Sequence, residues 1–338
     1  MKKILSFFLA LSFGLLSVSA QNKDPEFVKY MNSPSVDSVY KSMTLKQQIG
    51  QMIFVELRPS NPSTVVKAMQ DVKDLNVGGA VLFLSKLPDQ AATINGLQSI
   101  ARTPLLIAID GEWGLGMRLQ DVDNFPYQMA LGSLKDNSLI YKMGLEVARQ
   151  AKRAGLHINL APTVDVNNNS LNPVIGYRSF GEDPKDVAAK GFSYIKGMED
   201  GGIICTAKHF PGHGDTETDS HADLPLISHD MNRLNSVELM PFHELVKNGA
   251  TGIMTAHLNV PAITGNSLPT SLSPKAIKEL IRDKWGYKGL IFTDGMEMRG
   301  ISKYYSPGQA ARMAAEAGND ILELVRDPKE AIDSIYAA

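Results

Sequence analysis

The sequence predicts an α/β protein of the (β/α)8 TIM-type barrel class, folded as a single domain. Two observations carry this prediction: short, continuous apolar runs of strand length recur along the chain, and amphipathic segments of helix length separate them. Continuous apolar runs are typical of strands buried on both faces of a parallel sheet. A formal net charge of −2 does not favour a broad nucleic-acid or membrane-surface binder, whose affinity comes from clustered Lys and Arg.

The first twenty residues predict a signal peptide. Lys2 and Lys3 precede an apolar run over 4–16, and Val18-Ser19-Ala20 places small residues where a signal peptidase cuts. The run is shorter than the roughly 20 residues that span a bilayer, which favours cleavage over a membrane anchor. We therefore expect residues 1–20 to be removed. Residues 21–338 would then be exported, periplasmic or secreted, without stable membrane insertion.

Eight apolar runs are predicted as strands, and eight amphipathic segments as helices. The predicted strands are 51–55, 79–84, 105–109, 156–160, 203–207, 252–256, 290–293 and 320–324. The predicted helices are 35–48, 63–75, 136–154, 184–198, 234–247, 274–284, 307–317 and 328–337. Several of the helices start at Pro, whose missing N–H costs nothing in a first turn.

This alternation favours a closed barrel over an open doubly wound sheet, because no Gly-x-Gly-x-x-Gly follows the first strand. Dividing 338 residues by about 150 per domain suggests two domains, but eight strand–helix units occupy nearly the whole mature chain. We therefore expect one catalytic barrel domain over 21–338. The last predicted helix is short and runs into Ala338, so the barrel is also compatible with being the first domain of a longer chain.

Ionisable residues terminate most of the predicted strands. In such barrels the active site lies at the C-terminal ends of the strands. For any one position, capping of the next helix or binding of loop amides explains the residue equally well, but the recurrence favours a functional site. The residues concerned are Glu56, Asp110, Asp165, Lys208, His209, His257, Asp294 and Glu323.

Two segments concentrate the chemistry. The long loop after the fifth strand reads Lys208-His209-Phe210-Pro211-Gly212-His213-Gly214-Asp215, and continues to Asp219-Ser220-His221 and Pro225. The seventh strand ends in Thr293-Asp294-Gly295. Long loops at the catalytic rim are more often functional than ordinary connections.

Three interpretations fit these segments. The residues His209, His213, Asp219 and His221 could bind a metal, although they lie in a Pro-Gly loop rather than on a helix. A non-catalytic sugar-binding module would explain polar rim residues. Acid/base and nucleophilic chemistry at an acetal carbon needs an ionised carboxylate and a group that donates and then accepts a proton. Asp and His meet these needs, and Asp219 is close enough to His221 to fix its tautomer.

At these residues the sequence resembles glycoside hydrolase family 3, in particular its β-N-acetylglucosaminidase branch. The loop from Lys208 to Pro225 carries the branch motif at its spacing, and further matches follow in chain order. These are Ile109-Asp110-Gly111-Glu112 with Arg118, Arg178-Ser179-Phe180-Gly181, Met254-Thr255-Ala256-His257 and Thr293-Asp294. Where the branch typically has Asp-Gln-Glu-Gly-Gly-Arg, this chain keeps the Asp, the Glu and the second Gly but has Gly111, Trp113 and Leu115 in place of the Gln, the first Gly and the Arg.

The resemblance implies roles for individual residues. Asp294 would be the nucleophile that forms a covalent glycosyl-enzyme, and His221 the acid/base, oriented by Asp219. The terminal sugar would be bound by Asp110, Arg118, Arg178, Lys208 and His209.

We therefore expect an exo-acting, retaining β-N-acetylglucosaminidase that hydrolyses terminal β-linked GlcNAc, derived from peptidoglycan. The expected partner is a carbohydrate substrate, with no nucleic acid, cofactor or metal. A β-glycoside phosphorylase, another family 3 β-glycosidase, a metal-dependent hydrolase and a non-catalytic sugar-binding protein remain alternatives. The sequence leaves the aglycone and the oligomeric state open.

Overall fold

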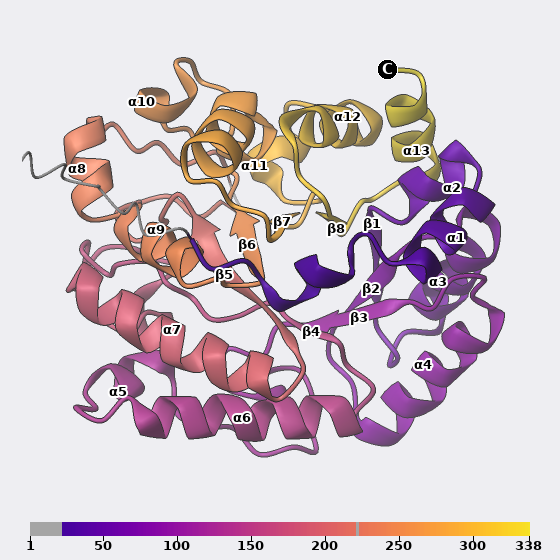
Figure 1. Ribbon diagram of the computed structural model, residues 1–338, viewed down its shortest axis with the longest axis horizontal. Coiled ribbons are helices and arrows are strands. Elements are labelled where there is room, and N and C mark those ends of the chain that lie inside the picture. Colours follow the sequence, from indigo (N-terminus) through magenta and orange to yellow (C-terminus); the bar gives the residue numbers. More distant parts are fainter. Residues whose placement is uncertain (1–21, 221–222) are drawn as a thin grey trace, which may run out of the picture.

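The computed structural model describes residues 22–220 and 223–338, so the predicted signal peptide and His221 lie outside the described residues. Eight parallel strands alternate with helices in the described part of the chain (Figure 1). A parallel bridge between Phe292 and Ile321 joins β7 to β8 and completes the ring, which confirms the predicted barrel. The strands are β1 (Ile53–Leu57), β2 (Gly79–Leu82), β3 (Leu106–Ile109), β4 (Ile158–Asn159), β5 (Ile204–Phe210), β6 (Gly252–Thr255), β7 (Leu290–Thr293) and β8 (Leu322–Glu323).

Helices surround the barrel, and many begin at a side-chain cap. Asp183, for example, accepts hydrogen bonds from the backbone N–H groups of Lys185 and Asp186 and so satisfies two of the free donors at the start of α7. The α-helices are α1 (Pro34–Ser42), α2 (Leu45–Gly50), α3 (Pro62–Leu75), α4 (Leu87–Ile100), α5 (Gln128–Gly132), α6 (Ser138–Arg153), α7 (Pro184–Asp200), α8 (Met231–Ser236), α9 (Met240–Lys247), α10 (Pro261–Thr264), α11 (Arg299–Ser302), α12 (Pro307–Ala317) and α13 (Pro328–Tyr336). Shorter helical segments are η1 (Glu26–Tyr30), η2 (Leu115–Met117), η3 (Gly176–Arg178) and η4 (Thr270–Leu272), and η5 (Lys275–Lys284) is a π-helix.

Two separate hydrophobic cores stabilise the barrel. A small cluster fills its interior and includes Phe54, Leu160, Met254, Phe292 and Ile321. A much larger cluster packs the outer face of the strands against the helices. Neighbouring residues of one strand belong to different cores because successive side chains of a strand point to opposite faces.

The structure differs from the sequence prediction at three helical segments. The predicted helix over 35–48 is two helices, α1 and α2, which are separated at Met43 and Thr44. The sequence reading missed α4, because its buried face includes Gln90, whose side chain donates a hydrogen bond to the Ala154 carbonyl at 2.6 Å. A polar residue on the inner face interrupts the apolar period by which a helix is recognised. The predicted helix over 234–247 is two helices, α8 and α9, which are separated at Val237–Leu239.

The chain segment before α1 crosses the end of the barrel where the strands begin (Figure 1). Asn22 donates a hydrogen bond to the Trp285 carbonyl just before β7, and the backbone N–H of Lys23 donates one to the Lys247 carbonyl just before β6. This end of the barrel is therefore covered, whereas the strand ends that carry the ionisable residues lie opposite.

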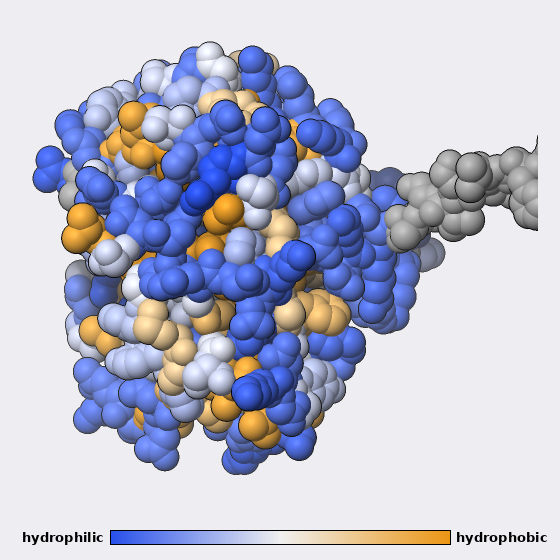
Figure 2. Space-filling model, turned by 90° about the vertical axis from the view of Figure 1, so that its left-hand side faces the viewer, coloured by the Kyte–Doolittle hydropathy of each residue, from blue (hydrophilic) through white to orange (hydrophobic). Residues whose placement is uncertain are grey.

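The outer surface is mainly hydrophilic where Figure 2 shows it, on the flank at the left of Figure 1, with small and separate hydrophobic groups. Among the described residues, no helix is long and apolar enough to cross a membrane.

Candidate active site

A cavity of 560 Å³ lies at the C-terminal ends of the strands. Six of the residues predicted from the sequence line it: Asp110, Arg118, Arg178, Lys208, His209 and Asp294. Asp219 is half-buried in the loop after β5, and its neighbour Ser220 reaches the cavity wall. The loop therefore brings the segment with the predicted acid/base to the same cavity as the predicted nucleophile, while His221 itself lies outside the described residues.

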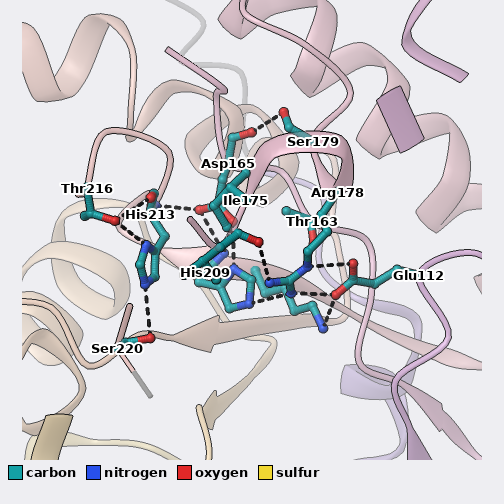
Figure 3. Close-up of polar contacts among 12 residues, drawn as sticks. Glu112, Thr163, Asp165, Ile175, Arg178, Ser179, His209, His213, Thr216 and Ser220 are labelled. Carbon is teal, nitrogen blue, oxygen red and sulfur yellow. Dashed lines mark hydrogen bonds and ion pairs between the residues drawn. The ribbon is translucent and has the colours of Figure 1, made fainter. Parts of the chain in front are cut away.

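Alternating cations and carboxylates line the side of the cavity that β3 and β5 form. Lys208 Nζ lies 2.9 Å from both Asp110 Oδ1 and Glu112 Oε1. Arg118 Nη2 donates to Asp110 Oδ2 at 2.5 Å. Arg178 binds Glu112 through two hydrogen bonds, from Nε at 3.0 Å and from Nη2 at 2.7 Å (Figure 3). These charge-assisted bonds hold every member of the cluster in one orientation.

The cluster keeps its carboxylates ionised although they are buried. Burial alone would raise the pKa of Asp110, but the charges of Lys208 and Arg118 lower it to about 2. Burial would likewise raise the pKa of Glu112, yet Arg178 and Lys208 hold it well below its ordinary value of 4.5. The same contacts raise the pKa of Lys208 against the effect of its own burial. At neutral pH the cavity wall therefore presents fixed positive and negative groups, which suits hydroxyl groups that both donate and accept hydrogen bonds.

Asp165, at the end of the β4 region, anchors the loop after β5. Its carboxylate accepts hydrogen bonds from the backbone N–H of His213 at 2.6 Å and from the backbone N–H of His209 at 3.2 Å. His209 Nδ1 lies 2.7 Å from Asp165 Oδ2, and its Nε2 lies 3.3 Å from Arg178 Nη2 (Figure 3). The imidazole of His209 is thereby fixed with one edge toward the cluster.

His213 is held within the loop. Its Nδ1 lies 2.8 Å from Thr216 Oγ1 and its Nε2 lies 3.1 Å from Ser220 Oγ. Burial, together with the nearby His209, lowers the pKa of His213 to about 4, so the ring is neutral at pH 7. The ring nitrogens of His209 and His213 thus have different partners and do not converge on one point, as the alternative metal site would require.

A second group of ligand-type side chains lies at the outer part of the loop. Side-chain atoms of Asp215, His229 and Glu238 lie within 4.8 Å of one another. Arg233 joins them, 3.0 Å from Glu238 and 3.6 Å from Asp215, and supplies the positive charge that a metal would otherwise supply. We interpret this group as an ion-pair cluster that fixes the loop.

Asp294 follows β7 and faces the cavity. Its backbone N–H donates to the Thr255 carbonyl at 2.9 Å, and its Oδ1 accepts the Gly295 N–H at 2.8 Å. His257 lies behind it, fully buried, with Nε2 3.0 Å from the Gly295 carbonyl and Nδ1 2.7 Å from Ser271 Oγ. The turn that presents the Asp294 carboxylate to the cavity is therefore held in place by hydrogen bonds to the surrounding protein.

The strand-end residues divide into two groups. Asp110, Lys208, His209, Asp294 and Glu323 line the cavity. The others serve the structure around it: Asp165 and His257 support the two site loops, and Glu56 pairs with Arg58.

Sequence reasoning missed the site role of Glu112. Its side chain is completely buried, and it binds both Arg178 and Lys208. The sequence did contain a signal for this role, because Glu112 is a second carboxylate two residues after Asp110. The predicted site already held three cations, Arg118, Arg178 and Lys208, which need negative partners.

A family of known proteins matches this architecture and these residues. Residues 44–338 match the model of the glycosyl hydrolase family 3 N-terminal domain. The β-hexosaminidase A of Pseudoalteromonas piscicida is 32% identical over 332 residues, covering 87% of this chain and 56% of that protein. The β-hexosaminidase of Nitrosomonas eutropha is 31% identical over 268 residues, covering 75% of each chain.

Solved structures agree. A glycoside hydrolase family 3 β-N-acetylglucosaminidase from Paenibacillus sp. str. FPU-7 superposes with a TM-score of 0.83 at 39% identity, covering 88% of this chain and 58% of that one. The (β/α)8 barrel with its carboxylate-rich cavity is therefore that of a glycosidase family, and this chain belongs to glycosyl hydrolase family 3. It spans little more than half the length of the Pseudoalteromonas and Paenibacillus relatives.

Proposed function

We propose that the protein is an exo-acting, retaining β-N-acetylglucosaminidase that removes terminal β-linked GlcNAc. The observation that carries the proposal is that one cavity is lined both by Asp294 and by the ion-paired cluster of Asp110, Lys208 and Arg178. A retaining glycosidase needs a carboxylate nucleophile beside a pocket that fixes the sugar. Relatives named β-hexosaminidase and β-N-acetylglucosaminidase support GlcNAc as the sugar.

The cluster of cations and carboxylates would bind the sugar hydroxyls. Lys208 and Arg178 donate hydrogen bonds, and Asp110 accepts them, so that adjacent hydroxyls find a donor and an acceptor each. Trp113 and Tyr177 also line the cavity, with ring centroids 6.4 Å apart, and offer flat surfaces to the apolar face of a sugar. Because the cluster is already ordered by its own contacts, binding would cost little side-chain entropy.

The reaction would proceed in two displacements. In the first, an Asp294 oxygen bonds to the anomeric carbon as the bond to the leaving oxygen breaks, and His221 gives its proton to that oxygen. In the second, the neutral His221 takes a proton from water, whose oxygen bonds to the anomeric carbon and releases Asp294. Asp219, two residues before His221, would orient the imidazole and stabilise its charged form.

A panel of 4-nitrophenyl β-glycosides that differ only at C2 and C4 tests this proposal. We expect the GlcNAc derivative to be hydrolysed with the highest kcat/KM and with release of free GlcNAc whether or not phosphate is present. A preference for the glucoside, or release of a sugar 1-phosphate, would contradict the proposal. Binding of GlcNAc without turnover of any substrate would indicate a sugar-binding protein instead.

We also propose that the protein acts outside the cytoplasm, where its substrates would be the peptidoglycan-derived glycans that the family resemblance implies. The basic and apolar start of the sequence, followed by Val18-Ser19-Ala20, supports export. Cell fractionation with N-terminal sequencing should find a chain that starts at Gln21 in the exported fraction. A cytoplasmic chain that starts at Met1 would contradict export while leaving the enzymatic proposal intact.

A further inference from the structure

Glu323 is a cavity residue with no part in the mechanism described above. Ile321, two residues earlier, belongs to the core inside the barrel, whereas Leu322 belongs to the outer core. Because alternate side chains of a strand share a face, Glu323 also points inward, and it lines the same cavity as Asp294.

The backbone of Glu323 is tied to the β7 loop that carries Asp294. Its N–H donates to Thr293 Oγ1 at 3.0 Å, and its carbonyl accepts the Met296 N–H at 2.8 Å. The position of Glu323 beside the predicted nucleophile is therefore fixed by hydrogen bonds on both sides.

One carboxyl oxygen of Glu323 lacks the kind of partner that the carboxylates of Asp110 and Glu112 have. The residue is 2% exposed, and its Oε1 forms no hydrogen bond within residues 22–220 and 223–338. Asp110 and Glu112, in contrast, each bind two cations. A buried polar atom without a partner is unfavourable, so a ligand in the cavity that supplies one gains affinity.

The surroundings favour the protonated form of Glu323. Burial, and then the negative charges of Asp110 and Asp294, raise the pKa of Glu323 well above its ordinary value, although Lys208 acts in the opposite direction. A neutral carboxylic acid has one O–H donor and one carbonyl acceptor. It is thus complementary to a hydroxyl group rather than to a cation.

The order in which the cavity residues follow one another around the barrel indicates which sugar hydroxyl Glu323 would contact. Starting from Asp294 at β7, one direction leads through Met254 on β6 and Lys208 on β5 to Asp110 at β3. The opposite direction leads to Glu323 on β8 and then to Val81 on β2.

The substituents of a bound GlcNAc also follow a fixed order around the sugar ring, which can be matched to the order of the cavity residues. From C1, one direction passes the acetamido group and the adjacent hydroxyls at C3 and C4, and the other passes the ring oxygen and the hydroxymethyl group at C6. The two adjacent hydroxyls match the polar cluster of Lys208 and Asp110, and the acetamido methyl matches the apolar Met254. In this orientation of the sugar the C6 hydroxyl lies on the side of Glu323. In the opposite orientation, the cluster of cations and carboxylates would face only the C6 hydroxyl.

We propose that the buried carboxyl group of Glu323 binds the C6 hydroxyl of the terminal sugar and makes the enzyme select sugars that carry this hydroxyl. This inference rests on the proposed function, from which it takes the sugar and the position of its C1.

The test compares 4-nitrophenyl β-GlcNAc with its 6-deoxy analogue. For the wild type we expect kcat/KM to be at least about 10-fold lower with the 6-deoxy substrate, the effect of one lost hydrogen bond with its unpaired partner. Glu323→Leu should lower kcat/KM about 10-fold with the parent substrate and change the 6-deoxy value by less than about 3-fold, so that the preference disappears. Glu323→Gln should retain the preference, because an amide also has a donor and an acceptor.

Other results would overturn the inference. Equal losses with both substrates in Glu323→Leu would show a structural role, and a Gln variant as weak as the Leu variant would show that the ionised carboxylate is needed. Glu316→Gln, on the surface helix α12 with a partner, Arg312, that is also outside the cavity lining, is the control and should keep the wild-type preference. Glu323→Met serves if the Leu variant does not fold.

Failure of the proposed function would be seen separately. It would appear as a wild type that prefers another aryl β-glycoside, and the same 6-deoxy comparison made on that glycoside still tests the Glu323 contact.

Discussion

Glu112→Gln is the substitution that examines the charge cluster most sharply. Glu112 is completely buried and accepts hydrogen bonds from Arg178 at 2.7 and 3.0 Å, with Lys208 2.9 Å away. Gln keeps the shape but removes the charge and turns an N–H₂ group toward a cation. Breaking a buried ion pair costs about 3–5 kcal/mol, and Lys208 keeps Asp110 as a partner. We therefore expect a loss of about 3 kcal/mol in the free energy of unfolding at pH 7.

The loss in the free energy of unfolding caused by Glu112→Gln should become smaller as the pH falls. The pKa of Glu112 in the folded protein lies below its ordinary value of 4.5, so its charge stabilises the fold fully above that pH. This stabilisation disappears as the pH falls from 4.5 toward the lower pKa of the folded state. The difference between wild type and Glu112→Gln should therefore shrink between pH 5 and the lowest pH at which both fold.

Thermal and urea unfolding measure both effects. An unfolding entropy of about 0.7 kcal/mol/K for a chain of this length converts 3 kcal/mol into a Tm decrease of roughly 4 °C. The control is Glu316→Gln, whose surface pair with Arg312 at 3.3 Å contributes about 0–1 kcal/mol. A Glu112→Gln loss no larger than that of the control, or one independent of pH, would refute the reasoning.

Three further predictions concern the loop and the chemistry. His221→Ala should lower kcat/KM roughly 10²–10⁴-fold with a GlcNAc disaccharide but much less with 4-nitrophenyl β-GlcNAc, whose leaving group scarcely needs a proton; equal losses would count against the acid role. Gly214→Ala should destabilise the protein by about 2 kcal/mol or more in urea unfolding, because its Cβ would lie 1.8 Å from the Val166 carbonyl oxygen. Its control, Gly96→Ala in α4, has open space around the new methyl group and should leave stability unchanged or slightly raised, and a similar result for both would contradict this packing argument. Incubation with EDTA should leave hydrolysis unchanged, whereas loss of activity restored by a divalent metal would support the metal-dependent alternative.

The strands were predictable because burial on both faces leaves a continuous apolar run. β7 (Leu290–Thr293) has the predicted bounds, and β6 differs by one residue. β5 continues to Phe210, three residues beyond the prediction, because Lys208 and His209 are polar members of a strand that lies within the site. The apolar pattern ends where the residues that line the cavity begin.

The sequence predicted those cavity residues that belong to short family motifs. Asp110, Arg178 and Lys208 matched family motifs, and the structure brings them into one cluster. The pairing of Glu112 with Arg178 and Lys208 depends on contacts between β3, β5 and η3, which no local spacing reveals. Glu323 ended a predicted strand, but only the packing shows that its Oε1 is buried without a partner.

The identity of the nucleophile is the central claim, and a trapped intermediate tests it most directly. A 5-fluoro derivative of N-acetylglucosaminyl fluoride slows both displacements, while its good leaving group keeps the first one measurable. Peptide mass spectrometry of the trapped enzyme should find the sugar on Asp294, and Asp294→Asn should form no adduct. A sugar on another residue, or rapid hydrolysis without any covalent species, would contradict a retaining mechanism through Asp294.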